Sequence, residues 1–138
     1  MKILLFTDCS VGVIGYHVDH AIALKKAGVD IFAVVSSKEL EPGLIQSMRE
    51  AGIPMILLSG LERHKNMWKH IFALSSYIQN NEINYVHVQT NWQLMLISVV
   101  RFFLLFRKRL SITYTIHAYR HNDPKKVFFA RVIIGILL

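Results

Sequence analysis

A glycine-containing loop near the N-terminus is the first segment whose residue types suit binding chemistry. It covers residues 8–15, between an apolar run that predicts a strand and a stretch that predicts a helix. Backbone N–H groups at the start of a helix, together with the helix dipole, favour phosphate or another anion, so Gly12 and Gly15 are candidate substrate-binding residues. Ser10 stands where the dinucleotide-binding fingerprint begins with glycine, and the loop has no P-loop Lys-Ser/Thr pair. Nicotinamide cofactors and P-loop nucleotides are therefore disfavoured, and a plain tight turn is the alternative.

A histidine stands at the corresponding place near the other end of the chain. His117 directly follows the apolar run 112–116, so its imidazole is predicted to emerge at the carboxyl edge of a sheet. There it could donate to a sugar hydroxyl or to a developing negative charge, which makes it the candidate catalytic residue; the alternative is a hydrogen bond to a neighbouring loop. His87 lies inside a predicted strand and is expected to be buried and satisfied locally. His17 and His20 lack a further ligand nearby in sequence, so no metal site is predicted.

Apolar runs bounded by turn-forming residues alternate along the chain with stretches of helical periodicity. Gly28 and Gly52 are predicted to end the first two helices, while Trp68 and Phe72 are placed on the apolar side of the third. The runs predict strands over residues 2–7, 29–36, 53–58, 85–88 and 110–116. The periodic stretches predict helices over residues 16–27, 42–51, 66–79 and 94–106, and a last helix from 123 to 138.

This alternation predicts an α/β fold with a doubly wound, mainly parallel sheet of the Rossmann-like kind. Each strand is a nearly continuous apolar run, as expected where helices cover both faces of a parallel sheet. In such sheets ligands bind beyond the carboxyl ends of the strands. Chemistry is therefore expected in the loops that follow Thr7, Ser36, Ser59, Val88 and Ile116.

Composition restricts the class of protein further. The chain has 138 residues and a formal net charge of +7, and 53% of its residues are hydrophobic, which is enough for the core of one domain and excludes intrinsic disorder. The single cysteine, Cys9, cannot form an internal disulfide, so a stapled secreted scaffold is excluded and a cytoplasmic location is expected. The positive charge predicts an anionic partner: nucleic acid, acidic lipid or a phosphorylated substrate.

An apolar segment followed by basic residues raises the question of a membrane. Residues 94–106 are too short to span a bilayer and are interrupted by Arg101. Arg107, Lys108 and Arg109 follow directly, so the segment suits either a core helix or a surface that rests on anionic lipid at the inner face of the cell membrane. The apolar stretch 132–138 further predicts that the native protein continues beyond Leu138.

Several segments, in this order, resemble a known family of enzymes. Tyr114-Thr115-Ile116-His117-Ala118 is similar to a Tyr-Thr-hydrophobic-His-Gly segment, and residues 83–90 are similar to a Pro-Asp-hydrophobic-hydrophobic-His-x-His segment, with Gln89 in place of the second histidine. Residues 1–4 resemble the family's opening, residues 21–31 resemble its first helix and second strand, and residues 52–54 resemble the entry to its third strand. Together they resemble the N-terminal lobe of a GT-B fold, family 4 (group 1) glycosyltransferase, and the resemblance covers most of the chain.

The resemblance implies a single acceptor-side domain over residues 1–138, with a C-terminal lobe that would bind the nucleotide sugar absent from this chain. It implies a nucleotide-diphosphate sugar as donor, no bound cofactor or metal, and retaining transfer to a polysaccharide or lipid-linked acceptor of the cell envelope. His117 would face the reacting sugar, and Gly12 and Gly15 would approach the phosphate or sugar. Thr90, at the end of the fourth-strand segment, is the third predicted substrate-binding residue. The lobe alone is expected to be inactive.

Two other classes of function compete with this resemblance. A flavodoxin-like module that binds a small ligand or regulates a partner would share the same pattern of elements. Its response-regulator form expects paired acids after the first strand and an aspartate after the third, whereas Asp8 stands alone and Ser59 ends the third run. Nucleic-acid binding is not predicted, because no helix carries a basic stripe with base-reading polar residues.

Overall fold

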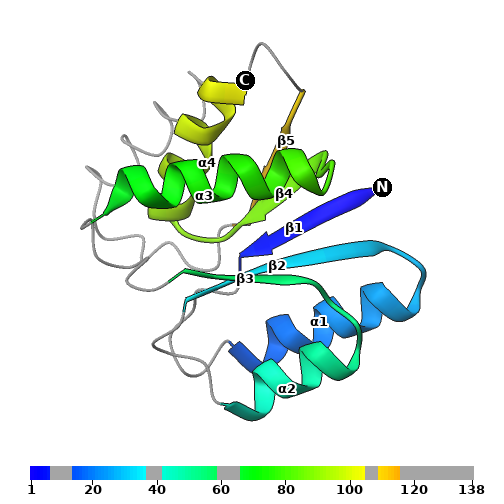
Figure 1. Cartoon of the computed structure of the whole chain (residues 1–138). Helices are drawn as coiled ribbons and strands as arrows, with labels where there is room; N and C mark the ends of the chain where they lie inside the picture. Colours follow the sequence, from blue (N-terminus) through cyan, green and yellow to red (C-terminus); the bar gives the residue numbers. More distant parts are fainter. Residues whose placement is uncertain (7–13, 37–41, 59–65, 105–108, 116–138) are drawn as a thin grey trace, which may run out of the picture.

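The structure is a computed structural model that describes residues 1–6, 14–36, 42–58, 66–104 and 109–115 (Figure 1). Strands and helices alternate in these residues. The strands are β1 (Lys2–Phe6), β2 (Asp30–Ser36), β3 (Met55–Leu58), β4 (Tyr85–Val88) and β5 (Ser111–Tyr114). The helices are α1 (Ile14–Lys26), α2 (Pro42–Glu50), α3 (Met67–Asn80) and α4 (Asn91–Leu104).

The five strands form one parallel sheet in the order β3-β2-β1-β4-β5. From β1 the chain moves outward through β2 to β3, then returns to the other side of β1 for β4 and β5. The predicted α/β fold with a doubly wound, parallel, Rossmann-like sheet is therefore confirmed. The direction of winding reverses between β1 and β4, which is the switch point at which such sheets bind ligands.

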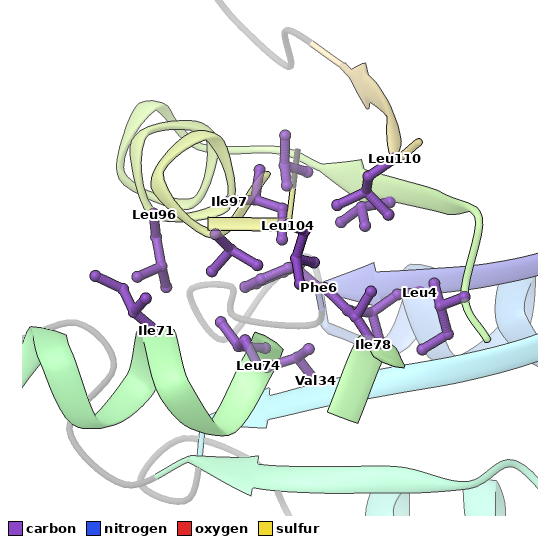
Figure 2. Packing of buried hydrophobic residues seen from close by; sticks show 14 of the residues in the cluster. Leu4, Phe6, Val34, Ile71, Leu74, Ile78, Leu96, Ile97, Leu104 and Leu110 are labelled. Atoms are coloured by element: carbon purple, nitrogen blue, oxygen red, sulfur yellow. The ribbon is translucent and has the colours of Figure 1, made fainter. Parts of the chain in front are cut away.

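The helices form two layers on opposite faces of the sheet (Figure 1). Helices α1 and α2 cover one face and α3 and α4 cover the other. Alternate residues of one strand therefore enter different cores: Leu4 and Phe6 pack toward α3 and α4, whereas Leu5 packs toward α1 and α2. Figure 2 shows the larger core, in which Leu4, Phe6 and Val34 of the sheet meet Ile71, Leu74 and Ile78 of α3 and Leu96, Ile97 and Leu104 of α4.

Three helices end with the same hydrogen-bonded turn. After α1, the N–H of Gly28 donates to the carbonyl of Lys25 (3.0 Å) and the N–H of Val29 to that of Leu24 (3.1 Å), which is the Schellman pattern. Gly28 has φ +84°, a left-handed conformation that favours glycine, and Gly52 repeats the turn after α2 with φ +66°. Glu82 occupies the equivalent position after α3 with φ 54°. The predicted glycine stops are thus confirmed.

The structure corrects two predictions. Helix α4 begins at Asn91, three residues before the predicted start at residue 94, because polar residues cap its first turn. Trp68 and Phe72, predicted on the apolar side of α3, are exposed, and its buried residues are His70, Ile71, Leu74 and Ile78. The predicted last helix, 123–138, lies outside the described residues.

Candidate functional site

The described part of the candidate site is the carboxyl edge of β4 and β5. Strand β4 adjoins the switch point, and Gln89 and Thr90 link its end to the first turn of α4. Strand β5 ends at Tyr114, paired with Val88, and Thr115 follows. Polar side chains from two strands and one helix therefore meet at the edge where open α/β sheets place their ligands.

Thr90 and Gln93 cap the first turn of α4 reciprocally. The N–H of Gln93 donates to Thr90 Oγ1 over 3.2 Å. Gln93 Oε1 accepts from the N–H groups of Gln89 (2.9 Å) and Thr90 (3.3 Å). This is the capping box formed by Ser/Thr-x-x-Glu/Gln, and here the side chain of Gln93 is fully buried. The backbone of the β4–α4 turn is thereby fixed, while Thr90 itself stays exposed beside the switch point.

Two further hydrogen bonds connect the end of β5 to its neighbours. Tyr114 Oη donates to Asn91 Oδ1 over 2.7 Å, which joins β5 to the start of α4. His87 Nε2 and Thr115 Oγ1 are also 2.7 Å apart, with the donor decided by the histidine tautomer. His87 has the local partner that the sequence predicted, but it is half-buried and not buried as expected. These hydrogen bonds join β4, β5 and the first turn of α4 at the carboxyl edge.

The structure describes two of the four predicted catalytic and substrate-binding residues. Thr90 lies at the switch point, as described, and Gly15 is the second residue of α1, on the carboxyl side of β1. Gly12 and His117 lie outside the described residues. Thr115, two residues before His117, is at the carboxyl edge.

The structure also describes two of the four predicted membrane-contact residues. Arg101 lies in the last turn of α4 and is half-buried, and Arg109 is exposed just before β5. Arg107 and Lys108 lie outside the described residues. In the part of the chain that the structure describes, no helix combines the length and apolar character needed to cross a bilayer.

Described residues also line two hollows that do not open beyond the carboxyl ends of the strands. The first, about 270 Å³, lies on the α1 face of β1, β4 and β5, and its lining residues are Met1, Ile3, Leu5, His20, Leu24, Tyr85, Val86, His87 and Thr113. The second, about 440 Å³, lies at the amino ends of β1 and β2 beside the Lys2–Glu82 ion pair. Because ligands of such sheets bind beyond the carboxyl ends of the strands, we assign neither hollow as the active site. Among the described residues, no three His, Cys, Asp or Glu side chains are grouped to hold a metal ion.

The sequence contained a signal for the capping box, which the helix prediction from apolar periodicity did not include. Thr90-Asn91-Trp92-Gln93 has the Ser/Thr-x-x-Gln spacing of a helix start, and it precedes the apolar residues of α4. The bond between Tyr114 and Asn91 had no such signal, because it depends on the pairing of β4 with β5.

Of the comparisons with known proteins, the one with solved structures found a match. No family model matches the sequence. No curated protein matches it either. Among solved structures, a glycosyltransferase from Rickettsia africae ESF-5 is similar over 97% of this chain, with a TM-score of 0.67 and 14% sequence identity. The chain covers 34% of the length of that structure. At this identity the likeness shows the fold alone: the chain has a glycosyltransferase-like, Rossmann-like α/β fold.

Proposed function

We propose that this chain is the acceptor-side lobe of a nucleotide-sugar-dependent glycosyltransferase. The observation that carries the proposal is the structural likeness to a glycosyltransferase over 97% of the chain. The order of the family 4-like segments along the sequence also supports it. One of them, Tyr114 to Ala118, begins at the last residue of β5. The likeness covers about one third of that structure, so a second lobe that binds the nucleotide sugar belongs to the proposal.

In the proposed reaction the bond between the anomeric carbon of the donor sugar and its phosphate oxygen breaks. The nucleoside diphosphate leaves with the bonding electrons, and a hydroxyl oxygen of a glycan or lipid-linked acceptor forms the new bond with retention of configuration. The acceptor's hydroxyl proton is taken up by the departing diphosphate. No metal or bound cofactor takes part in this scheme.

We expect the residues proposed to act on the sugar to lie near one another at the carboxyl edge of the sheet. His117 follows Thr115 by two residues, and its imidazole would donate to a hydroxyl or to the charge that develops on the transferred sugar. Thr90 Oγ1 already accepts from the N–H of Gln93, so its hydroxyl proton would serve the substrate. Gly12 and Gly15, on either side of the start of α1, would let the backbone approach a phosphate or sugar.

The test is sugar transfer by the whole protein. Purified protein is incubated with a panel of nucleotide-diphosphate sugars and a lipid and glycan extract of the host, and nucleoside diphosphate release is measured. We expect release with at least one donor, and a decrease of about a hundredfold in kcat/KM for His117→Ala, the order of effect of a group that stabilises developing charge. Arg49→Gln, an exposed change on α2, is the matched control and retains the activity.

Two outcomes contradict the proposal. Absence of release with every donor would remove the transferase assignment and favour the flavodoxin-like module. Turnover by the chain of residues 1–138 alone would contradict the requirement for a second lobe.

A further inference from the structure

Four large aromatic side chains are exposed together on α3 and α4. Trp68 and Phe72 lie one turn apart on α3 and are 57% and 62% exposed; Phe102 and Phe103, in the last turn of α4, are 65% and 46% exposed. The ring centroid of Phe103 lies 6.3 Å from that of Trp68, 6.5 Å from that of Phe72 and 6.0 Å from that of Phe102. These four residues, which we call the aromatic patch, form a contiguous apolar surface contributed by two helices.

The aromatic patch is separate from the core beneath it. Ile71 and Leu74 of α3 and Leu96 of α4 are fully buried between the helices and the sheet (Figure 2). The core is therefore filled without the four aromatic rings. A contiguous apolar patch on a folded domain marks a surface that contacts another molecule, because leaving it in water is unfavourable.

The charged side chains of α3 and α4 are all positive. Neither α3 nor α4 contains aspartate or glutamate, although the chain has nine such residues. Lys69 is exposed beside Trp68, and Arg101 directly precedes Phe102. Arg109 is exposed a few residues beyond α4. An occupant of this surface thus meets aromatic rings and cations with no anion on either helix.

We propose that the aromatic patch rests in the headgroup region of an anionic lipid bilayer, with Lys69 and Arg109 on lipid phosphates. Tryptophan and other aromatic rings favour the boundary between headgroups and acyl chains, and basic residues nearby add attraction to anionic lipid. The contact is interfacial, because no described helix is able to cross a bilayer. On this surface the proposed transferase would meet a lipid-linked acceptor. Only that meeting rests on the proposed function; the membrane contact itself does not.

Vesicle binding by the whole protein tests the aromatic part of the surface. The probes are vesicles of phosphatidylcholine and phosphatidylglycerol in a two-to-one ratio, and vesicles of phosphatidylcholine alone. We expect the protein to sediment with the anionic vesicles, and the double variant Trp68→Ser, Phe102→Ser to partition at least about tenfold less. The matched control is Leu57→Ser on β3, a residue that is 48% exposed and outside the two helices. Because all three side chains are exposed in the structure, circular dichroism is expected to show folded protein for each variant.

A second pair of variants separates a local contact from the overall positive charge. Lys69→Gln with Arg109→Gln removes the exposed cation beside Trp68 and the exposed cation that precedes β5, and Lys26→Gln with Arg49→Gln removes two cations from the α1–α2 layer. Both variants lower the net charge equally. We expect the first pair to weaken binding to anionic vesicles several-fold and the second to leave it within a factor of about two, because attraction to a surface decays over about a Debye length.

Three results of the vesicle-binding experiments would overturn the proposal: no binding of the whole protein to anionic vesicles, equal loss from the aromatic double variant and Leu57→Ser, or equal loss from the two charge variants. The fluorescence of Trp68 adds an independent reading, since its emission is expected to shift to the blue on anionic vesicles and the shift to disappear in Trp68→Phe. No vesicle-dependent shift would mean that another part of the protein, or a protein partner, covers the surface. None of these measurements uses sugar transfer, so vesicle binding without turnover would contradict the proposed function alone.

Discussion

The two helical layers of this domain are alike on the inside and different on the outside. Both bury aliphatic side chains against the sheet, in one core under α1 and α2 and another under α3 and α4. The outer surface of α1 and α2 carries charges of both signs, from Asp19, Lys25, Lys26, Arg49 and Glu50. The outer surface of α3 and α4 has no acid and exposes the aromatic patch. Since a fold of this kind needs only the inner faces, we attribute the outer difference to what each layer contacts.

The largest expected effect separates the inner from the outer side of α3. Leu74 is fully buried, and Leu74→Ala should lower the free energy of unfolding by about 2–5 kcal/mol, the cost of lost burial plus a cavity. Phe72 is 62% exposed, and Phe72→Ala should change the free energy of unfolding by less than about 0.5 kcal/mol. Urea unfolding measures both. A cost for Phe72→Ala as large as that for Leu74→Ala would show that the aromatic patch belongs to the core.

A second experiment compares a glutamine in each layer. Gln93→Leu leaves the N–H groups of Gln89 and Thr90 without their acceptor at a buried position, and should cost about 1–3 kcal/mol of unfolding free energy. Gln46 on α2 is exposed and bonds only Glu50 in the same helix (2.9 Å), so Gln46→Leu should cost less than about 0.5 kcal/mol. Equal values in thermal or urea unfolding would contradict the reading of Gln93 as the residue that fixes the β4–α4 turn.

The smallest expected effect concerns a hydroxyl inside the α3–α4 layer. Tyr77 packs edge-on against Phe32, and its Oη is buried with no hydrogen-bond partner among the described residues. Burial raises the pKa of Tyr77 above its ordinary 10.0, so the folded state holds the phenolic proton more tightly than the unfolded state. Because the unfolded state therefore ionises at a lower pH than the folded state, the free energy of unfolding falls as the pH rises above 10.

Tyr77→Phe tests that pH dependence directly. The variant should be more stable than the parent by up to about 1 kcal/mol at neutral pH, because it removes an unpaired buried hydroxyl. Its unfolding free energy should also fall less steeply than that of the parent as the pH is raised above 10. Parallel alkaline profiles for the two proteins would show that Tyr77 has no such role.

The order and type of the elements could be predicted from the sequence because they depend on local patterns. Each strand is a short apolar run, and Gly28 and Gly52 mark the ends of α1 and α2 by a conformation that other residues avoid. The strand Tyr85–Val88 was predicted with its observed limits. The start of α4 was predicted too late because the apolar pattern begins at Leu94, whereas the helix begins at its polar cap.

The surfaces and the contacts of the candidate site could not be predicted in the same way. Trp68 and Phe72 lie in register with Ile71 and Leu74 closely enough that helical periodicity assigned all four to one apolar side. Only the packing of α3 against α4 and the sheet decides which rings stay outside. The links of Tyr114 to Asn91 and of His87 to Thr115 join residues far apart in sequence, so they depend on the neighbouring positions of β4 and β5.

The most direct test of the difference between the layers is a depth measurement on membrane-bound protein. In a Cys9→Ser background, a spin label is placed at Phe102→Cys in the aromatic patch or at Ala23→Cys, an exposed position on α1. On anionic vesicles, we predict that the label at position 102 becomes accessible to oxygen and shielded from a water-soluble nickel complex, while the label at 23 stays in water. Equal accessibility of the two labels to the nickel complex would contradict the assignment of the α3–α4 layer to the membrane.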